Sequence, residues 1–149
     1  MSEKTLVLIK PDAMKRKIDS QIIQNILSDE ITLVAAKKIH PDKNLILSHY
    51  NSENLIKRHG PNIKSLINYF SSGFILALVF EGANVVRKIK KICGDKPIPK
   101  ECEKTSIRYR YGSKVKNYYS DEGCIMNLVH SSSTPDIAKV EINLWFGDI

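Results

Sequence analysis

One segment near the C-terminal end brings a histidine, three serines, a threonine and a glutamate close together in sequence. It reads NLVHSSSTPDIAKVEINLWF and runs from Asn127 to Phe146. A short apolar run leads into His130, and the polar residues after it end at Pro135, a residue that often begins a helix. With helical spacing, Glu141 lies four positions before Trp145 and shares the apolar side of that helix. The segment therefore places a carboxylate where an apolar residue is expected.

A buried, unpaired carboxylate costs on the order of several kcal/mol, so Glu141 needs a hydrogen-bonding partner. His130, just before the helix, is the obvious candidate. A carboxylate on one imidazole nitrogen fixes the tautomer and makes the other nitrogen a better nucleophile. We interpret the pair as a nucleophilic or general-base histidine with its orienting acid. A structural His–Glu hydrogen bond at a helix entrance is the alternative that spacing alone leaves open.

A predicted helix carries Glu141, and a predicted strand leads into His130. The helix is predicted to begin at Pro135, with Thr134 as its cap, and to face the core with Ile137, Val140, Leu144 and Trp145. The strand before it is predicted over IMNLV, residues 125–129, so that His130 comes directly after it.

The rest of the chain alternates between strand and helix patterns. Strands are expected at Thr5–Lys10, Thr32–His40 and 74–81, where apolar residues run continuously or β-formers dominate. Helices are expected after an Asp19-Ser20 cap, over 43–72 with a break at Gly60-Pro61, and from the cap Asn84 through Cys93. Residues 94–123 show no sustained period.

This order of elements favours a ferredoxin-like α+β fold. We expect one four-stranded antiparallel sheet with helices packed around it, and we expect one face of the sheet to carry them. A chain of 149 residues with 42% apolar content suits a single domain, 1–149. No GxGxxG or P-loop motif follows a strand.

The composition and the cysteines indicate the cellular compartment in which the chain works. No apolar run is long enough to span a membrane, and the polar start argues against a signal peptide. The three cysteines lack metal or disulfide spacing, which favours free thiols in a reducing compartment, the cytoplasm. His40, His49 and His59 share no ligand spacing and are interpreted as ordinary surface or core residues.

The positive charge is concentrated in one stretch. The chain carries +7, and residues 87–116 hold eleven Lys or Arg against three acids, which gives +8 there and −1 elsewhere. Such a field attracts polyanions: a nucleoside triphosphate, nucleic acid or an anionic lipid surface. A solvated face that keeps the chain soluble is the alternative.

Several motifs, taken in order, resemble nucleoside diphosphate kinases over nearly the whole chain. They are TLVLIKPDAMKR, His49-Tyr50, SGFILALVFEGANVV, SIR at 106–108 and NLVHSSSTPDIAKVEINLWF. The resemblance implies the ferredoxin-like sheet, a tetramer or hexamer, and transfer of the γ-phosphate of a nucleoside triphosphate to a nucleoside diphosphate. It also implies a ping-pong cycle through a phosphohistidine, with Mg²⁺ brought by the nucleotide phosphates and no metal held by the protein.

Residue by residue, the resemblance makes His130 the phosphorylated nucleophile, Glu141 its orienting acid and Ser132 a hydrogen-bonding neighbour of that carboxylate. Lys10 and Tyr50 would lie by the transferred phosphate. The implied nucleotide-binding residues are Lys10, Lys90, Lys96, Arg108, Asn127, Asn62 and Leu66. Cations around a polyanionic substrate suit phosphoryl transfer, which depends on positioning and charge stabilisation.

The chain departs from the family pattern around the site. Ser131 and Ser133 replace a glycine and an aspartate of the usual HGSDS. Asn62 stands where an aromatic ring usually stacks on the base, Lys90 replaces an arginine, and Lys96 replaces a threonine. The segment after Arg108 is longer than the common form and has Tyr-Arg-Tyr in place of GDF.

Two alternatives follow from these departures and from the charge. The chain could be a catalytically weak or inactive member that binds nucleotide or acts as a scaffold. It could also bind single-stranded nucleic acid through its basic, tyrosine-bearing region, although no recognition motif supports this.

Overall fold

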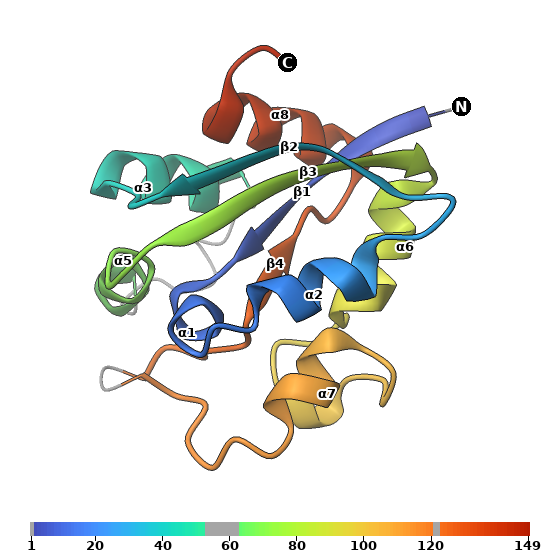
Figure 1. Cartoon of the computed structure of the whole chain (residues 1–149). Helices are drawn as coiled ribbons and strands as arrows, with labels where there is room; N and C mark the ends of the chain where they lie inside the picture. Colours follow the sequence, from blue (N-terminus) through green and yellow to red (C-terminus); the bar gives the residue numbers. More distant parts are fainter. Residues whose placement is uncertain (1, 53–62, 121–122) are drawn as a thin grey trace.

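A four-stranded antiparallel sheet forms the centre of the fold (Figure 1). The computed structural model of the chain describes residues 2–52, 63–120 and 123–149. The sheet order is β2-β3-β1-β4, and each neighbouring pair is antiparallel. The strands are β1 (Ser2–Ile9), β2 (Thr32–Ile39), β3 (Ile75–Ala83) and β4 (Val129–Ser131). The expected ferredoxin-like sheet is confirmed.

Helices cover both faces of this sheet (Figure 1). One face carries α2 (Asp19–Ile26), α6 (Val85–Cys93) and α7 (Ile107–Gly112), and the other carries α3 (Lys43–Ser52), α5 (Ile63–Phe70) and α8 (Pro135–Phe146). The expectation that one face would carry the helices was wrong. Successive strand side chains point to opposite faces, and β1 and β3 are apolar on both, so each face needs a cover.

The first helices differ from the predicted pattern. A short helix, α1 (Pro11–Lys15), follows β1 at a place where no helix was predicted. Its first residue is proline, whose fixed φ suits that position. The predicted Asp19-Ser20 cap was wrong, because α2 begins at Asp19 itself and the cap position, Ile18, makes no side-chain hydrogen bond. The predicted break at Gly60-Pro61 lies outside the described residues.

The last helix, α8, begins at Pro135 with Thr134 as its cap, as predicted. The Thr134 hydroxyl accepts a hydrogen bond from the Ile137 amide at 3.2 Å and caps α8. The buried stripe of α8 is Ala138, Glu141, Ile142 and Trp145. Val140 is 47% exposed, so its predicted place in the core was wrong. The apolar pattern allowed either stripe, and the hydrogen bonds of Glu141 favour the observed one.

Strand β4 is shorter than predicted and includes His130. Residues 125–128 are not part of it, because Leu128 has φ 76°, a left-handed conformation that interrupts an extended chain. In the sheet, His130 lies opposite Leu8 of β1. The catalytic candidate is therefore fixed by backbone pairing to the central strand.

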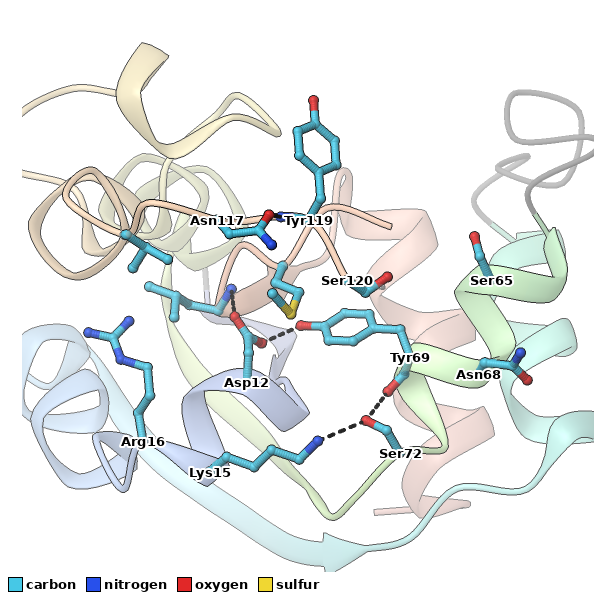
Figure 2. A pocket seen from close by; sticks show the side chains of 14 residues that line it. Asp12, Lys15, Arg16, Ser65, Asn68, Tyr69, Ser72, Asn117, Tyr119 and Ser120 are labelled. Carbon is cyan, nitrogen blue, oxygen red and sulfur yellow. Dashed lines mark hydrogen bonds between the residues drawn. The ribbon is translucent and has the colours of Figure 1, made fainter. Parts of the chain in front are cut away.

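The long segment between α6 and β4 is partly helical. It contains a short 3-10 helix, η2 (Pro99–Glu101), and then α7. Beyond α7 it runs past α1 and α5 and encloses with them a pocket of about 530 Å³ (Figure 2). The pocket is lined by residues of all three segments, among them Asp12, Arg16, Asn68, Tyr69, Asn117 and Ser120.

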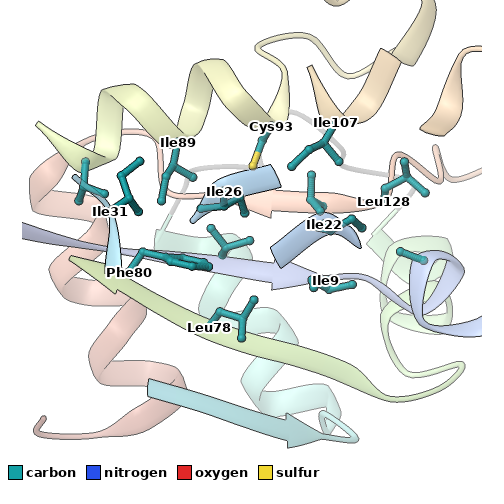
Figure 3. Packing of buried hydrophobic residues seen from close by; sticks show 14 residues of the cluster. Ile9, Ile22, Ile26, Ile31, Leu78, Phe80, Ile89, Cys93, Ile107 and Leu128 are labelled. Carbon is teal, nitrogen blue, oxygen red and sulfur yellow. The ribbon is translucent and has the colours of Figure 1, made fainter. Parts of the chain in front are cut away.

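Each face of the sheet has its own core. Figure 3 shows the first, in which Ile9, Leu78 and Phe80 of the sheet pack against Ile22, Ile26, Ile89, Cys93 and Ile107 of the helices. The second holds Leu6 and Leu8 of β1, Phe70 of α5 and Trp145 of α8. In the described ranges, no helix has the length and apolar character to cross a membrane.

Candidate active site

His130 and Glu141 meet as the spacing predicted. The His130 Nε2 atom lies 3.0 Å from Glu141 Oε2 and 3.2 Å from Oε1. The His130 side chain is 14% exposed, whereas Glu141 is fully buried. The ring thus presents Nε2 to the carboxylate, and Nδ1 lies on the other side of the imidazole. A carboxylate on one nitrogen fixes the orientation of the imidazole and can make its other nitrogen a better nucleophile.

The buried carboxylate of Glu141 has further partners. The Ser132 hydroxyl donates a hydrogen bond to Oε1 at 2.6 Å. Ser132 is itself fully buried, and its hydroxyl accepts a hydrogen bond from the Leu6 amide at 3.3 Å. Hydrogen bonds of this kind offset the cost of removing the carboxylate from water.

His49, which sequence reasoning treated as ordinary, also belongs to this group. Its Nδ1 lies 3.3 Å from Glu141 Oε2, and the Trp145 indole N–H donates to the same nitrogen at 3.1 Å. Burial, followed by the charge of His130, lowers the pKa of His49 to about 3. The imidazole is therefore neutral at pH 7, and its contact with Glu141 is not an ion pair. The only sequence signal was its place beside Tyr50 in the quoted motif.

Lys10 and Asn127 form a second part of the site. Lys10 follows β1, and its Nζ donates to Asn127 Oδ1 at 2.6 Å. The Asn127 amide donates in turn to the Pro97 carbonyl oxygen at 2.9 Å. Burial, and then the charge of Arg108, lowers the pKa of Lys10 to about 8. A bound anion would therefore favour the charged, ammonium form of Lys10.

Arg108 ties the loop after α6 to the strand that carries His130. Its Nη1 donates to the carbonyl oxygens of Gly94 at 3.0 Å and Lys96 at 2.9 Å, and its Nη2 donates to that of Val129 at 2.8 Å. The buried Nε has no hydrogen-bond partner within the described residues. Burial lowers the pKa of Arg108, but an arginine remains charged at any physiological pH.

Asp12, in the TLVLIKPDAMKR segment, was not predicted as a site residue. Its Oδ1 accepts a hydrogen bond from the Tyr69 hydroxyl, and its Oδ2 accepts one from the Leu128 amide at 3.1 Å (Figure 2). The Leu128 carbonyl oxygen in turn accepts from the Lys10 amide at 2.8 Å. These bonds hold the left-handed turn that places Asn127 beside Lys10.

Comparison with known proteins identifies the family of this chain. The family model for nucleoside diphosphate kinase matches residues 3–149. A nucleoside diphosphate kinase of Persephonella marina is 35% identical over 144 residues, which cover 97% of this chain and 93% of the relative. The chain belongs to the nucleoside diphosphate kinase family.

Solved structures of the family share the fold. A transition-state mimic of the Borrelia burgdorferi nucleoside diphosphate kinase, with bound vanadate and ADP, has a TM-score of 0.85 and 28% identity, covering 99% of this chain and 88% of that one. The apo enzyme of Encephalitozoon cuniculi has a TM-score of 0.83 and 30% identity, covering 98% and 90%.

Family membership establishes the activity. The chain is a phosphotransferase that moves the γ-phosphate of a nucleoside triphosphate to a nucleoside diphosphate. The comparisons give no support to the scaffolding or nucleic-acid-binding alternatives.

The other residues expected from the nucleoside diphosphate kinase pattern differ in burial and in their contacts. Tyr50 is buried beside His49, with ring centroids 5.5 Å apart, and burial raises its pKa. Leu66 is 6% exposed and packs in the second core. Lys90 and Lys96 are exposed. Asn62 lies outside the described residues.

The serine that replaces the family's glycine after the histidine fits its place. Ser131 pairs with Val7 in the sheet, and it is absent from the non-glycine residues that have positive φ in the described ranges. An extended strand position does not need the backbone freedom of glycine. The departure at Ser131 therefore leaves the local backbone unstrained.

One group of described side chains could hold a metal ion by position. Ligand atoms of His49, His130 and Glu141 lie within 4.8 Å of one another. Two imidazoles and one carboxylate do not suit Mg²⁺, which prefers oxygen ligands in octahedral geometry. The hydrogen bonds already described account for this group without a metal.

Proposed function

We propose that phosphoryl transfer passes through His130 in two half-reactions. In the first, Nδ1 attacks the γ-phosphorus, the bond to the β–γ bridging oxygen breaks, and the nucleoside diphosphate leaves with the electron pair. In the second, a phosphate oxygen of another nucleoside diphosphate takes the phosphoryl group and frees Nδ1. The single observation that carries this proposal is the Nε2 contact with Glu141 at 3.0 Å, which leaves Nδ1 as the nucleophile.

Neighbouring residues are proposed to bind the nucleotide. Lys10 and Arg108 would stabilise charge on the transferred and outer phosphates. Arg108 supports this, because its terminal nitrogens donate to carbonyl oxygens while its buried Nε–H meets no acceptor among the described residues. Asn127 would contact the sugar, and Tyr50 would lie by the transferred phosphate.

The resemblance also supplies residues for the outer phosphates and for the base of the nucleotide. We propose Lys90 and Lys96 for the outer phosphates, and both are exposed lysines in the basic stretch. The resemblance places Asn62 and Leu66 at the base. Because asparagine lacks an aromatic ring, we expect weaker stacking on the base. The Borrelia relative with ADP and vanadate supports a site of this kind in the same fold.

Magnesium would arrive with the substrate. When bound to the nucleotide, Mg²⁺ neutralises phosphate charge. The described carboxylate nearest His130 is buried and already hydrogen-bonded, so the phosphate oxygens are the suitable ligands.

A labelling experiment tests the role of His130. Wild-type protein incubated with [γ-³²P]ATP and Mg²⁺ should take up label that is acid-labile and alkali-stable, and His130→Ala should take up none. His40→Ala is the matched control, because His40 is exposed and makes a ring contact with Phe74. Folded wild-type protein that remains unlabelled would rule the proposal out.

We also propose a homo-oligomer that works in the cytoplasm. Strand β2 has a neighbour on one side only, and it exposes Leu33 and Val34 at 37% and 42%. An apolar strand edge of this kind suits pairing with a second copy. The three cysteines are free and buried, which suits a reducing compartment.

A further inference from the structure

His49 has no part in the half-reactions proposed above, yet it contacts the carboxylate that holds His130. It lies on α3, is 1% exposed, and reaches Glu141 from a segment distant in sequence from both residues. Its ring meets that of His130 edge to face, with centroids 4.5 Å apart. The ring is also edge to face with Tyr50 and Trp145, at 5.5 and 5.8 Å. Its orientation is therefore fixed from several sides.

One nitrogen of His49 faces two groups with opposite requirements. Trp145 Nε1 can only donate, so its bond to Nδ1 at 3.1 Å requires an unprotonated Nδ1. The Glu141 oxygen at 3.3 Å can only accept while ionised, so a bond there requires Nδ1–H. The two bonds cannot exist together. The tautomer of His49 therefore decides whether Glu141 Oε2 gains a second donor besides His130 Nε2–H.

We propose that His49 is a positioning residue for phosphoryl transfer, which acts through Glu141 and exchanges its Nδ1 hydrogen bond between Trp145 and that carboxylate. Ser132 holds Oε1 and His49 borders Oε2, so the carboxylate cannot rotate freely. A fixed carboxylate keeps the proton of His130 on Nε2 and the lone pair on Nδ1, as the proposed function requires. This inference rests on that function only for its kinetic consequence.

Substitutions at His49 separate positioning from space filling. His49→Leu keeps bulk but removes both hydrogen bonds, whereas His49→Asn can place an amide N–H or oxygen near the position of Nδ1. We expect kcat of His49→Leu to fall about tenfold to hundredfold, because small misplacements of reacting groups have effects of this size. The KM for nucleotide should change less than about threefold, and His49→Asn should recover most of the lost kcat. His40→Leu, at an exposed histidine, is the control.

The tautomer of His130 gives a readout that does not depend on turnover. Nitrogen-15 NMR of histidine-labelled protein should show His130 mainly as the Nε2–H tautomer in the wild type and as a mixture in His49→Leu. Trp145→Phe removes the competing donor, so His49 itself should move toward its Nδ1–H tautomer. If His49→Leu does not fold, His49→Asn and Trp145→Phe carry the same measurements.

Two results would overturn the inference. One is a His49→Leu protein with kcat within about twofold of wild type, against the effect expected of a misplaced catalytic group, and with an unchanged His130 tautomer. The other is His49→Asn impaired as much as His49→Leu while the tautomer stays unchanged, which would mean that His49 only fills space. If wild-type His130 takes no phosphoryl group, the proposed function fails, but the tautomer comparison still decides the role of His49.

Discussion

At the scale of single residues, burial sets the properties of the site. Glu141 is fully buried, and its hydrogen bonds to Ser132 and His130 offset the cost of burying its carboxylate. Lys10 is 8% exposed, and burial holds its pKa at about 8. A buried cation with few acids around it is a site that a phosphate group completes.

Lys10 gives a prediction about proton uptake. Its ammonium is partly deprotonated at pH 8.5 in the free protein, and a bound polyphosphate should raise its pKa toward the ordinary value. Nucleoside triphosphate binding at pH 8.5 should therefore take up as much as about one proton. Titration calorimetry in buffers of different ionisation enthalpy measures this number. Lys10→Met should abolish the uptake, and equal uptake by both proteins would contradict the assignment.

The same group affects stability without nucleotide. Its folded pKa of about 8 lies below the ordinary lysine value of 10.5, so between these pH values the unfolded chain binds more protons than the folded one. Stability should therefore rise from pH 8 to 10.5 by as much as about 3 kcal/mol from this residue. Urea unfolding across this range should show less of a rise in Lys10→Met. If the free energy of unfolding of the wild type rose no more than that of Lys10→Met between pH 8 and 10.5, the predicted direction would be wrong.

At the scale of elements, α8 and β4 hold the two residues that we propose take part in the chemistry. Helix α8 begins at a proline with a threonine cap, and its buried stripe carries Glu141 toward His130 on β4. Strand β4 is held by β1 on one side, opposite Leu8. The distance between the two catalytic candidates depends on where α8 begins.

Thr134→Ala tests that start. Loss of the cap should reduce the free energy of unfolding by about 1 kcal/mol, since the Ile137 amide loses its acceptor. Urea unfolding measures the change. Thr105→Ala, at an exposed threonine outside helices and strands, should change stability by less than about 0.5 kcal/mol. Equal effects of the two substitutions would show that the cap contributes nothing special.

Ser131→Gly tests whether the family's glycine is needed. Because Ser131 is an extended strand residue, the substitution should not raise kcat/KM by more than about twofold, and it should cost about 0.5–1 kcal/mol in stability. Steady-state kinetics and thermal unfolding measure both. A large gain in rate would mean that Ser131 limits catalysis in a way the backbone does not reveal.

Local patterns predicted the parts of the site that lie close together in sequence. The Thr134 cap and the burial of Glu141 follow from one helical segment, and its contact with His130 spans only eleven residues. The contacts of His49 and Asp12 join segments 96 and 116 residues apart, so no local period could reveal them. Val140 was misplaced because its helix has two plausible apolar stripes, and tertiary contacts choose between them.

At the scale of the whole molecule, the site lies at the β4 edge of the sheet, beside β1. Helices α3, α5 and α8 cover the face that holds His49 and Glu141 (Figure 1). Arg108 of α7 donates to the carbonyl oxygen of Val129, the first residue of β4. Segments distant in sequence thus contribute to one site. The opposite edge of the sheet, β2, is left for contacts with other molecules.

Val34→Lys tests the proposed use of that edge. A charge on the exposed strand should break an oligomer into smaller species while the fold is retained, because edge lysines oppose strand pairing. Light scattering after size exclusion measures the mass, and circular dichroism checks the fold. Val140→Lys, at an exposed valine on α8, is the matched control. A mass change in the control alone would move the interface to α8.

The position of the phosphoryl group on the imidazole shows whether Nδ1 of His130 is the nucleophile. Protein labelled with nitrogen-15 in histidine, incubated with ATP and Mg²⁺, can be examined by phosphorus and nitrogen NMR under alkaline conditions. The structure predicts one phosphoryl group on Nδ1 of His130, with Nε2 still protonated toward Glu141. A phosphoryl group on Nε2, or on another residue, would contradict the account.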